Sequence, residues 1–343
     1  MNTEFLKSLA KVCAPSGAEK AAASIIEKEI APFCDEVKYD KIGNLIAKIS
    51  PKNGAPEKKM MLVSHMDEVG FMVKSIDNDG RVRIALLGDV DTRTLSGRRV
   101  TFTNGVCGIV AAKPIHVLSE GERSKPTAVK SLYIELGTKD KAETEELIRV
   151  GDYGTFEPKF VEMKNGHLAG KALGGRSCVA LLCELIRTID KEKLKDELYF
   201  VFSVKREIAK MQFGAETAAF TLAPDFAVIL DATASADFDG VKEYDRGAKC
   251  GGGVVLAPAD MKTIYDRRAF AEAVSFCEEN EISFQYPATA AGAETEASAI
   301  HKTGVGIPSL SLGVATRNLR SGAEIISQND LDATLALLKH LVK

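Results

Sequence analysis

Two kinds of hydrophobic spacing alternate along the chain and predict where helices and strands lie. Residues 2–13 and 18–33 carry apolar side chains at helical spacing. Shorter apolar runs follow them and predict strands at 37–39, 45–49 and 59–64. Because helices lead into buried strands here, the pattern predicts an α/β layer at the start of the chain.

The pattern changes between residues 70 and 158, where short apolar runs are separated by turn signals. These runs predict strands at 71–76, 82–87, 99–103, 106–111, 131–135 and 154–157. Asp77–Gly80 is typical of a hairpin turn, and one helix is expected at 138–149. We therefore interpret 70–158 as a small β-barrel-like domain inserted into an α/β domain formed by 1–69 and 159–343.

The α/β pattern returns in the second half of the chain. An apolar helix is predicted to follow Arg176 and to run to about Ile189. Further helices are predicted at 212–220, 267–279, 297–302 and 328–343. Strands are predicted at 197–204, 225–230, 282–285 and 309–314. The predicted fold class is therefore α/β.

Polar residues stand at or just beyond the ends of three predicted strands. They are His65, Glu207 and Asp231. Asp67 shares a face with His65 at strand spacing, which suits a carboxylate that orients a metal-binding imidazole. Open α/β sheets bind ligands at the carboxyl ends of their strands, so the pattern predicts a metal site or catalytic cleft there. The alternative is that these side chains simply face water.

Composition narrows the classes of function. The chain has 343 residues, more than one hydrophobic core usually supports, and a net charge of −3. It has no Lys/Arg cluster of the kind that binds nucleic acid, and no apolar run near the roughly 18 residues of a membrane span. Its seven cysteines are scattered without C-x-x-C spacing, which predicts reduced cysteines in a cytoplasmic protein.

Motifs along nearly the whole chain carry a family resemblance. They are CAPSGAE at 13–19, DKIGNL at 40–45, SHMDEVGFMV at 64–73, LYIELG at 132–137, GKALGGR at 170–176, FGAETAAF at 213–220, LDAT at 230–233, TEASAIH at 295–301 and TRNLRSGAE at 316–324. Because it has these motifs in this order, the chain resembles metallopeptidase family forty-two, the glutamyl and tetrahedral (TET) aminopeptidases.

The resemblance implies a fold and an activity. The fold is a three-layer, zinc-aminopeptidase-like α/β domain interrupted by a β-barrel-like domain that serves in dimerisation or as a lid. The activity is that of a two-metal aminopeptidase that uses zinc or cobalt and acts on short peptides. The resemblance also implies a homo-oligomer, from a dimer to a dodecamer.

The resemblance also carries family roles onto individual residues. His65 matches a metal-ligand histidine, and Asp67 matches the aspartate that orients it. Glu207 and Asp231 match two further metal ligands. These four residues are the part of the family site that this chain retains.

Four other positions depart from the family pattern. Gly174 stands where the family has the aspartate that bridges both metals, and Gly175 replaces the aspartate after it. Arg206 stands in place of the glutamate that acts as general base, and Arg320 replaces the last ligand histidine. The resemblance therefore implies a degraded metal site, in which the bridge, the base and one ligand are lost.

These departures change the expected chemistry. Two divalent cations about 3.5–4 Å apart need an anionic ligand between them, and Gly174 supplies none. An always-protonated Arg206 cannot act as a base toward water. His65 and Asp231 retain part of one metal site, whereas zinc normally takes three or four protein ligands. We therefore expect no metal cofactor, or a single weakly bound divalent ion.

The lost ligands are replaced by positive charge. Relative to the family pattern, the changes at 174, 206 and 320 together add four positive charges, the charge of two divalent cations. One hypothesis is that the guanidinium groups of Arg206 and Arg320 occupy the former metal volume and pair with Glu207, Asp231 and Asp67. The alternative is drift after loss of function, with both arginines turned to water.

Three functions are consistent with this sequence. The first is a non-catalytic relative that binds short peptides or acts as a partner subunit. The second is an active metal-dependent aminopeptidase that recruits other ligands from Glu294, Glu296, His301 or Asp67. The third is a structural subunit that co-assembles with an active paralogue. The chemistry of the departures favours the first, and family membership favours the second.

Overall fold

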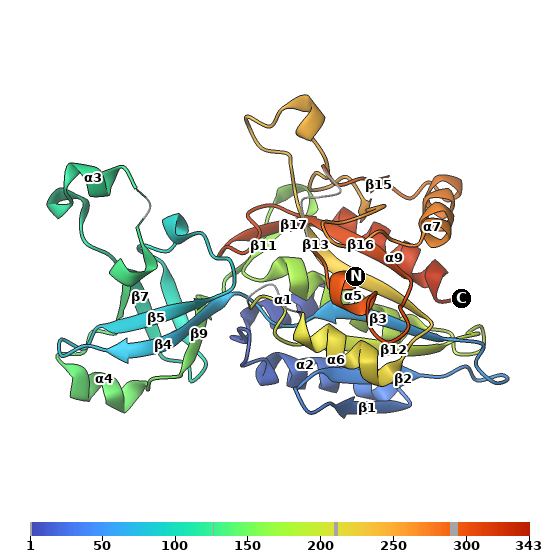
Figure 1. Cartoon of the computed structure of the whole chain (residues 1–343), viewed down its shortest axis with the longest axis horizontal. Helices are drawn as coiled ribbons and strands as arrows, with labels where there is room; N and C mark the ends of the chain where they lie inside the picture. Colours follow the sequence, from blue (N-terminus) through green and yellow to red (C-terminus); the bar gives the residue numbers. More distant parts are fainter. Residues whose placement is uncertain (1, 126, 209–211, 289–293) are drawn as a thin grey trace.

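The computed structural model describes residues 2–125, 127–208, 212–288 and 294–343, and within them the chain forms one large sheet, a closed barrel and a small sheet (Figure 1). The large sheet has its strands in the order β1 (Glu36–Tyr39), β2 (Leu45–Ile49), β12 (Glu197–Ser203), β3 (Lys59–His65), β13 (Phe226–Ala234), β16 (Ser309–Thr316), β14 (Val254–Leu256) and β15 (Phe284–Gln285). The four central strands β12, β3, β13 and β16 are parallel. Their carboxyl ends therefore meet at one edge, as the sequence pattern predicted.

Helices cover both faces of this sheet and make three layers (Figure 1). One face packs against α1 (Thr3–Lys11), α2 (Lys20–Ile30), α5 (Leu173–Thr188), α7 (Arg267–Glu279) and α9 (Gln328–Leu341). The other face packs against α6 (Phe213–Leu222) and α8 (Ala297–Ile300). Because side chains alternate along a strand, Leu62 of β3 enters the first core, whereas Met61 and Val63 enter the second. The predicted α/β class is confirmed.

The middle of the chain forms the closed barrel, which Figure 1 shows beside the large sheet. Its strands run in the order β4 (Gly70–Ile76), β5 (Val82–Leu87), β8 (Tyr133–Glu135), β7 (Cys107–Ala111), β6 (Arg99–Phe102) and β9 (Tyr153–Phe156). The barrel also carries α3 (Glu120–Arg123) and α4 (Lys141–Leu147). Its own apolar core includes Phe71 and Phe102, whose rings meet edge to face. The predicted barrel is confirmed, and the exact boundaries 1–69, 70–158 and 159–343 stay a prediction.

Several short strands were missed or placed wrongly from the sequence. The small sheet consists of β10 (Phe160–Glu162), β11 (His167–Gly170) and β17 (Glu324–Ser327), none of which was predicted, and β14 was missed as well. Three- and four-residue strands give too few apolar positions to show a period. The strand predicted to end before Asp231 instead continues to Ala234, because Ala232–Ala234 pair with Val314–Thr316 of β16.

A buried cluster of charges joins the barrel to the large sheet. Glu68 lies between β3 and β4 and accepts hydrogen bonds from Lys171, Arg176, Thr155 and the backbone of Ala14. Burial of a carboxylate is costly unless its oxygens are paired, and here both oxygens are. This cluster fixes the start of α5 beside the strand ends where the candidate site lies. In the part of the chain described here, no helix combines the length and the apolar character needed to cross a membrane.

Candidate functional site

The site begins with the register of three parallel strands. His65 of β3 lies beside Ser203 of β12, and Val63 lies beside Ile229 of β13. Two residues further along β13, Asp231 therefore reaches the same level as His65. Parallel pairing thus brings together two residues that lie far apart in the sequence, at the edge where open α/β sheets bind ligands.

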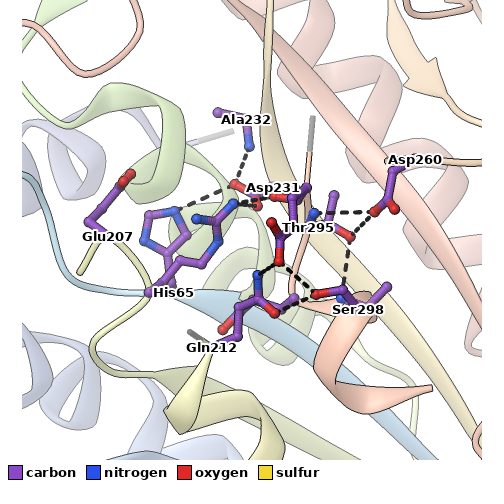
Figure 2. A network of polar contacts seen from close by, with 12 residues as sticks. His65, Glu207, Gln212, Asp231, Ala232, Asp260, Thr295 and Ser298 are labelled. Atoms are coloured by element: carbon purple, nitrogen blue, oxygen red, sulfur yellow. Dashed lines mark hydrogen bonds and ion pairs between the residues drawn. The ribbon is translucent and has the colours of Figure 1, made fainter. Parts of the chain in front are cut away.

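His65 is held between two carboxylates. Its Nδ1 lies 3.2 Å from Asp67 Oδ1, and its Nε2 lies 3.5 Å from Asp231 Oδ1. Figure 2 shows His65 and Asp231 facing each other, with Glu207 on the other side of His65 in this view. Burial on its own lowers the pKa of His65, but the contacts with Asp231 and Asp67 raise that pKa well above its ordinary value. The carboxylates on both sides of the ring therefore favour the protonated imidazole.

Arg206 follows a tight turn after β12. Lys205 has a φ of 59°, and this left-handed conformation turns the next side chain toward the strand ends. The Nη2 of Arg206 lies 3.1 Å from Asp231 Oδ2 and also donates to the backbone carbonyl of Glu294. Burial raises the pKa of Asp231, but the Arg206 charge outweighs it with help from His65, so that this pKa stays well below its usual range.

Arg320 reaches the same region from the other side. Its Nε lies 2.8 Å from Glu207 Oε2, an ion-pair distance without the alignment of a hydrogen bond. Its Nη1 lies 3.4 Å from Oδ2 of Asp89, whose side chain is largely exposed. Both arginines therefore lie within contact distance of a carboxylate that the pairing hypothesis named, Arg206 with Asp231 and Arg320 with Glu207.

Asp67, the third predicted partner of the arginines, has other contacts. It accepts hydrogen bonds from the Ser16 hydroxyl and from the Glu207 backbone at 2.9 Å, and it contacts His65. Among the described residues, no hydrogen bond or ion pair joins it to an arginine. Its contact with His65 suits the orienting role that the sequence suggested for Asp67, and that role stays a prediction.

The two glycines at the start of α5 lie against the site in different ways. A Cβ at Gly175 would lie 2.5 Å from Cε1 of His65, so any side chain there would collide with the imidazole. A Cβ at Gly174 would instead meet Ala232 Cβ at 2.7 Å and Leu319 at 2.9 Å. The assignment of Gly174 as the former bridging position stays a prediction. In this backbone, the glycine that faces His65 is Gly175.

Glu324 is a site residue that the sequence did not reveal. Its two oxygens accept hydrogen bonds from the backbone N–H groups of Gly174 and Arg320, each at 2.7 Å. It supplies the carboxylate at the first turn of α5, where Ala172 gives no side-chain cap. It also fixes Arg320 at a φ of 64°. Burial raises the pKa of Glu324 to about 7.

A second polar network borders the site. Oε1 of Glu294 accepts hydrogen bonds from Gln212 at 2.8 Å, Lys262 at 2.8 Å and Ser298 at 3.1 Å. Figure 2 shows this network running from Gln212 through Ser298 toward Thr295. These contacts fix the backbone carbonyl of Glu294 that Arg206 binds.

The residues considered as substitute ligands lie at different distances from the site. Glu294 lines its cavity. Glu296 is fully buried, accepts a hydrogen bond from Ser203, and has its pKa raised to about 7 by burial. His301 bonds its Nδ1 to the Ala297 carbonyl and is not part of the cavity lining. Glu294 and Glu296 are therefore near the strand ends, and His301 is not.

A cavity of about 460 Å³ opens above these strand ends. Its polar lining includes His65, Asp67, Arg206, Glu207, Asp231 and Arg320. Apolar side chains, among them Val69, Met261 and Leu319, complete the walls. This mixture and this volume are those of a small-ligand site.

A larger hollow, of about 610 Å³, lies against the barrel strands β6, β7 and β8. Four of its five charged lining residues form the Arg81–Asp79 and Arg99–Glu157 ion pairs at the surface. We place the candidate site at the sheet edge, because buried charges and shifted pKa values gather there.

The donors at the sheet edge do not fit a pair of divalent cations. Within the described residues, no group of three or more His, Cys, Asp or Glu side chains is arranged to hold a metal ion. Oδ1 of Asp231 accepts the Ala232 N–H at 2.7 Å, and Oδ2 faces Arg206. Glu207 faces Arg320. The carboxylates that a metal would need already compensate guanidinium charge.

Comparisons with known proteins agree with the fold. The sequence model of the M42 glutamyl aminopeptidase family matches residues 43–337. The lysyl aminopeptidase of Pyrococcus furiosus is 27% identical over 99% of this chain and 96% of its own. The crystal structure of a TET aminopeptidase from a marine-sediment Thaumarchaeota archaeon is 29% identical and superposes with a TM-score of 0.93 over 99% of this chain and 95% of that one. The TET1 peptidase of Pyrococcus horikoshii, which can assemble into a tetrahedron or a large octahedral shell, is 28% identical, with a TM-score of 0.86 over 99% of this chain and 98% of that one.

Proposed function

Because the chain belongs to the M42 glutamyl aminopeptidase family, we propose that it is a non-catalytic member that binds short peptides, alone or as a partner subunit. The observation that carries this proposal is the contact of Arg206 with Asp231 at 3.1 Å. Arg206 stands where the family has its general base. A guanidinium that is permanently protonated and already bonded to a carboxylate cannot remove a proton from water.

The charges around Arg206 support the same proposal. Burial on its own lowers the pKa of Arg206, but the charges of Asp231 and Glu207 raise it above its ordinary value. Contacts with Asp231 and Asp67 raise the pKa of His65 above its ordinary value. A guanidinium presents no free lone pair, so Arg206 serves neither as a base nor as a metal ligand. The proposed cofactor state is no metal, or one weakly bound divalent ion.

The cavity suits a small peptide. Its volume of about 460 Å³ lies within the usual range for small-ligand sites, and it combines apolar walls with fixed polar groups. Because the TET1 peptidase of P. horikoshii assembles into large shells, the proposal includes a homo-oligomer of this chain, or co-assembly with an active paralogue.

The second candidate function is an active metal-dependent aminopeptidase that removes N-terminal residues from short peptides. One observation favours it: the contact between His65 and Asp67 is retained at 3.2 Å. This candidate needs Arg206 to leave Asp231, and a further ligand from Glu294 or Glu296.

The test is a metal analysis together with an activity assay on the purified full chain. After mild dialysis we expect well under one divalent ion per chain, and no turnover of aminoacyl-p-nitroanilides with added zinc or cobalt. The matched variant is His65→Ala, which leaves any adventitious metal content unchanged. Two tightly held ions that His65→Ala removes, with turnover that chelators abolish, would establish the second candidate instead.

A further inference from the structure

The cavity at the sheet edge holds arginine donors that protein acceptors use only in part. A guanidinium carries five N–H groups. Arg206 is 7% exposed, and only its Nη2 is used, toward Asp231 and the Glu294 carbonyl. Its Nε is buried without a hydrogen-bond partner, and among the described residues none accepts a hydrogen bond from its Nη1. A donor group this deeply buried normally has its hydrogen bonds satisfied.

Arg320 adds further donors from the opposite wall. Its Nε faces Glu207 without hydrogen-bond alignment, and its Nη1 makes only a 3.4 Å contact with Asp89. Glu324 holds the backbone of Arg320 at 2.7 Å, so the base of this side chain has a fixed position. Two partly used guanidinium groups therefore line one cavity from separate elements.

The carboxylates of the cavity, in contrast, are largely occupied by protein donors. Three of them, Asp67, Asp231 and Glu294, each have three such contacts. Glu207 Oε2 is the exception, because it is buried without a hydrogen-bond partner beside Arg320. The cavity therefore offers a ligand guanidinium donors from two walls and one carboxylate acceptor. The ion pairs with Asp231 and Glu207 already balance much of the charge of the two guanidinium groups. Recognition of a ligand therefore rests on well-aligned hydrogen bonds more than on a strong positive field.

We propose that this cavity binds the α-carboxylate of a short peptide between Arg206 and Arg320, an inference that rests on the proposed peptide-binding function. The planar guanidinium fork matches the two oxygens of a carboxylate and can bind both at once. Val69, Met261 and Leu319 lie in the same lining and would contact the ligand's side chain. The peptide is held by its α-carboxylate, and this binding requires no catalytic group.

The same chemistry could be supplied by an acidic side chain, so the probes separate the two sources. Isothermal titration of the full chain uses alanyl-alanine, alanyl-alaninamide, glutamyl-alaninamide and inorganic phosphate. We expect alanyl-alanine to bind at least tenfold more tightly than its amide, because a hydrogen bond to a charged group is lost with the carboxylate. If glutamyl-alaninamide binds more tightly than alanyl-alanine, the site recognises a side-chain carboxylate. The assignment to the α-carboxylate is then overturned.

Variants at Arg320 link the binding to this cavity. Arg320 is partly exposed, so its replacement leaves the core intact. We expect Arg320→Gln to weaken alanyl-alanine binding at least tenfold, and Arg320→Lys to weaken it as well, since an ammonium lacks the fork. The matched control is Arg187→Gln, which removes an arginine from an ion pair with Glu29 at the far end of α5. This control should bind like the unchanged protein.

Three further results would overturn the proposal of an α-carboxylate site. They are equal affinities for alanyl-alanine and its amide, no binding of either dipeptide, and binding of phosphate alone. None of these results depends on peptide hydrolysis. Turnover of aminoacyl-p-nitroanilides would overturn the proposed non-catalytic function, but it would not produce any of these three binding results. Failure of the proposed function and failure of the carboxylate site are therefore distinguishable.

Discussion

Arg206 and Asp231 form an ion pair across 3.1 Å, and each side chain is less than a tenth exposed. In the proposed correspondence with the family, Arg206 stands in place of a general base and Asp231 matches a metal ligand. A buried carboxylate without a counter-charge is costly, so Asp231 needs a cation beside it. The guanidinium of Arg206 supplies it.

The first prediction concerns the stability that this pair provides. Arg206→Ala leaves Asp231 buried beside His65 alone, and we expect it to lower the free energy of unfolding by about 3–5 kcal/mol. Arg206→Ala/Asp231→Ala should cost less than the sum of the single variants, since the stranded charge is then gone. Denaturant unfolding of the four proteins measures this coupling.

The control for this cycle is Arg187→Ala, because Arg187 forms a surface ion pair with Glu29. We expect it to cost about 0–1 kcal/mol. If Arg206→Ala is as mild as Arg187→Ala, the guanidinium contributes nothing at the site, and drift becomes the better explanation of the substitution.

A second prediction tests the packing of His65 against α5. A Cβ at Gly175 would lie 2.5 Å from Cε1 of His65, and both residues are buried. We expect Gly175→Ala to destabilise the chain by about 1–3 kcal/mol, the usual cost of overpacking. The matched variant is Gly121→Ala, where a Cβ meets nothing within 4 Å. Thermal unfolding should separate the two, and equal melting temperatures would show that His65 moves aside without cost.

The sequence predicted the broad fold, and His65, Glu207 and Asp231, which it placed at strand ends, line one cavity. Both results depend on patterns that one chain displays. Strand periodicity located β3, and family motifs assigned roles to His65 and Asp231. The sequence could not show which carboxylate each arginine meets, because that depends on the turns at Lys205 and Arg320. Glu324 was missed for a similar reason: it lies in a strand of four residues, and its partners are backbone groups of α5 and of the turn before β17.

The third prediction concerns pH. Burial raises the pKa of Glu296 from its ordinary 4.5 to about 7, although the nearby His65 charge and the Ser203 hydrogen bond lower it in part. The folded state therefore binds more protons than the unfolded state between about pH 4.5 and 7. The contribution of this group to stability is complete below that window and is lost as the pH rises through it.

Glu296→Gln removes this titration. We expect the fall in unfolding free energy between pH 4.5 and 7 to shrink by on the order of 1–3 kcal/mol in this variant. Urea unfolding at several pH values measures the change. Glu278→Gln, an exposed change on α7, serves as the control and should leave the slope unaltered. An unchanged slope in Glu296→Gln would mean that Glu296 is ionised in the folded chain throughout this range.

The last prediction concerns restoration of the family pattern by Gly174→Asp, Arg206→Glu and Arg320→His together. In the proposed correspondence with the family, these changes return two carboxylates and an imidazole, so on ligand chemistry alone the triple variant should bind zinc. The backbone opposes this outcome, because a Cβ at Gly174 would meet Ala232 at 2.7 Å and Leu319 at 2.9 Å. We therefore expect the triple variant to be less stable than the starting chain and to hold less than one zinc ion after dialysis.

Elemental analysis and calorimetric titration with zinc provide the measurement. The control is Arg206→Glu/Arg320→His, which keeps Gly174 and so isolates the effect of the added side chain. Two tightly bound ions in the triple variant would show that the start of α5 adapts readily, and that the glycines are not what keeps metals out.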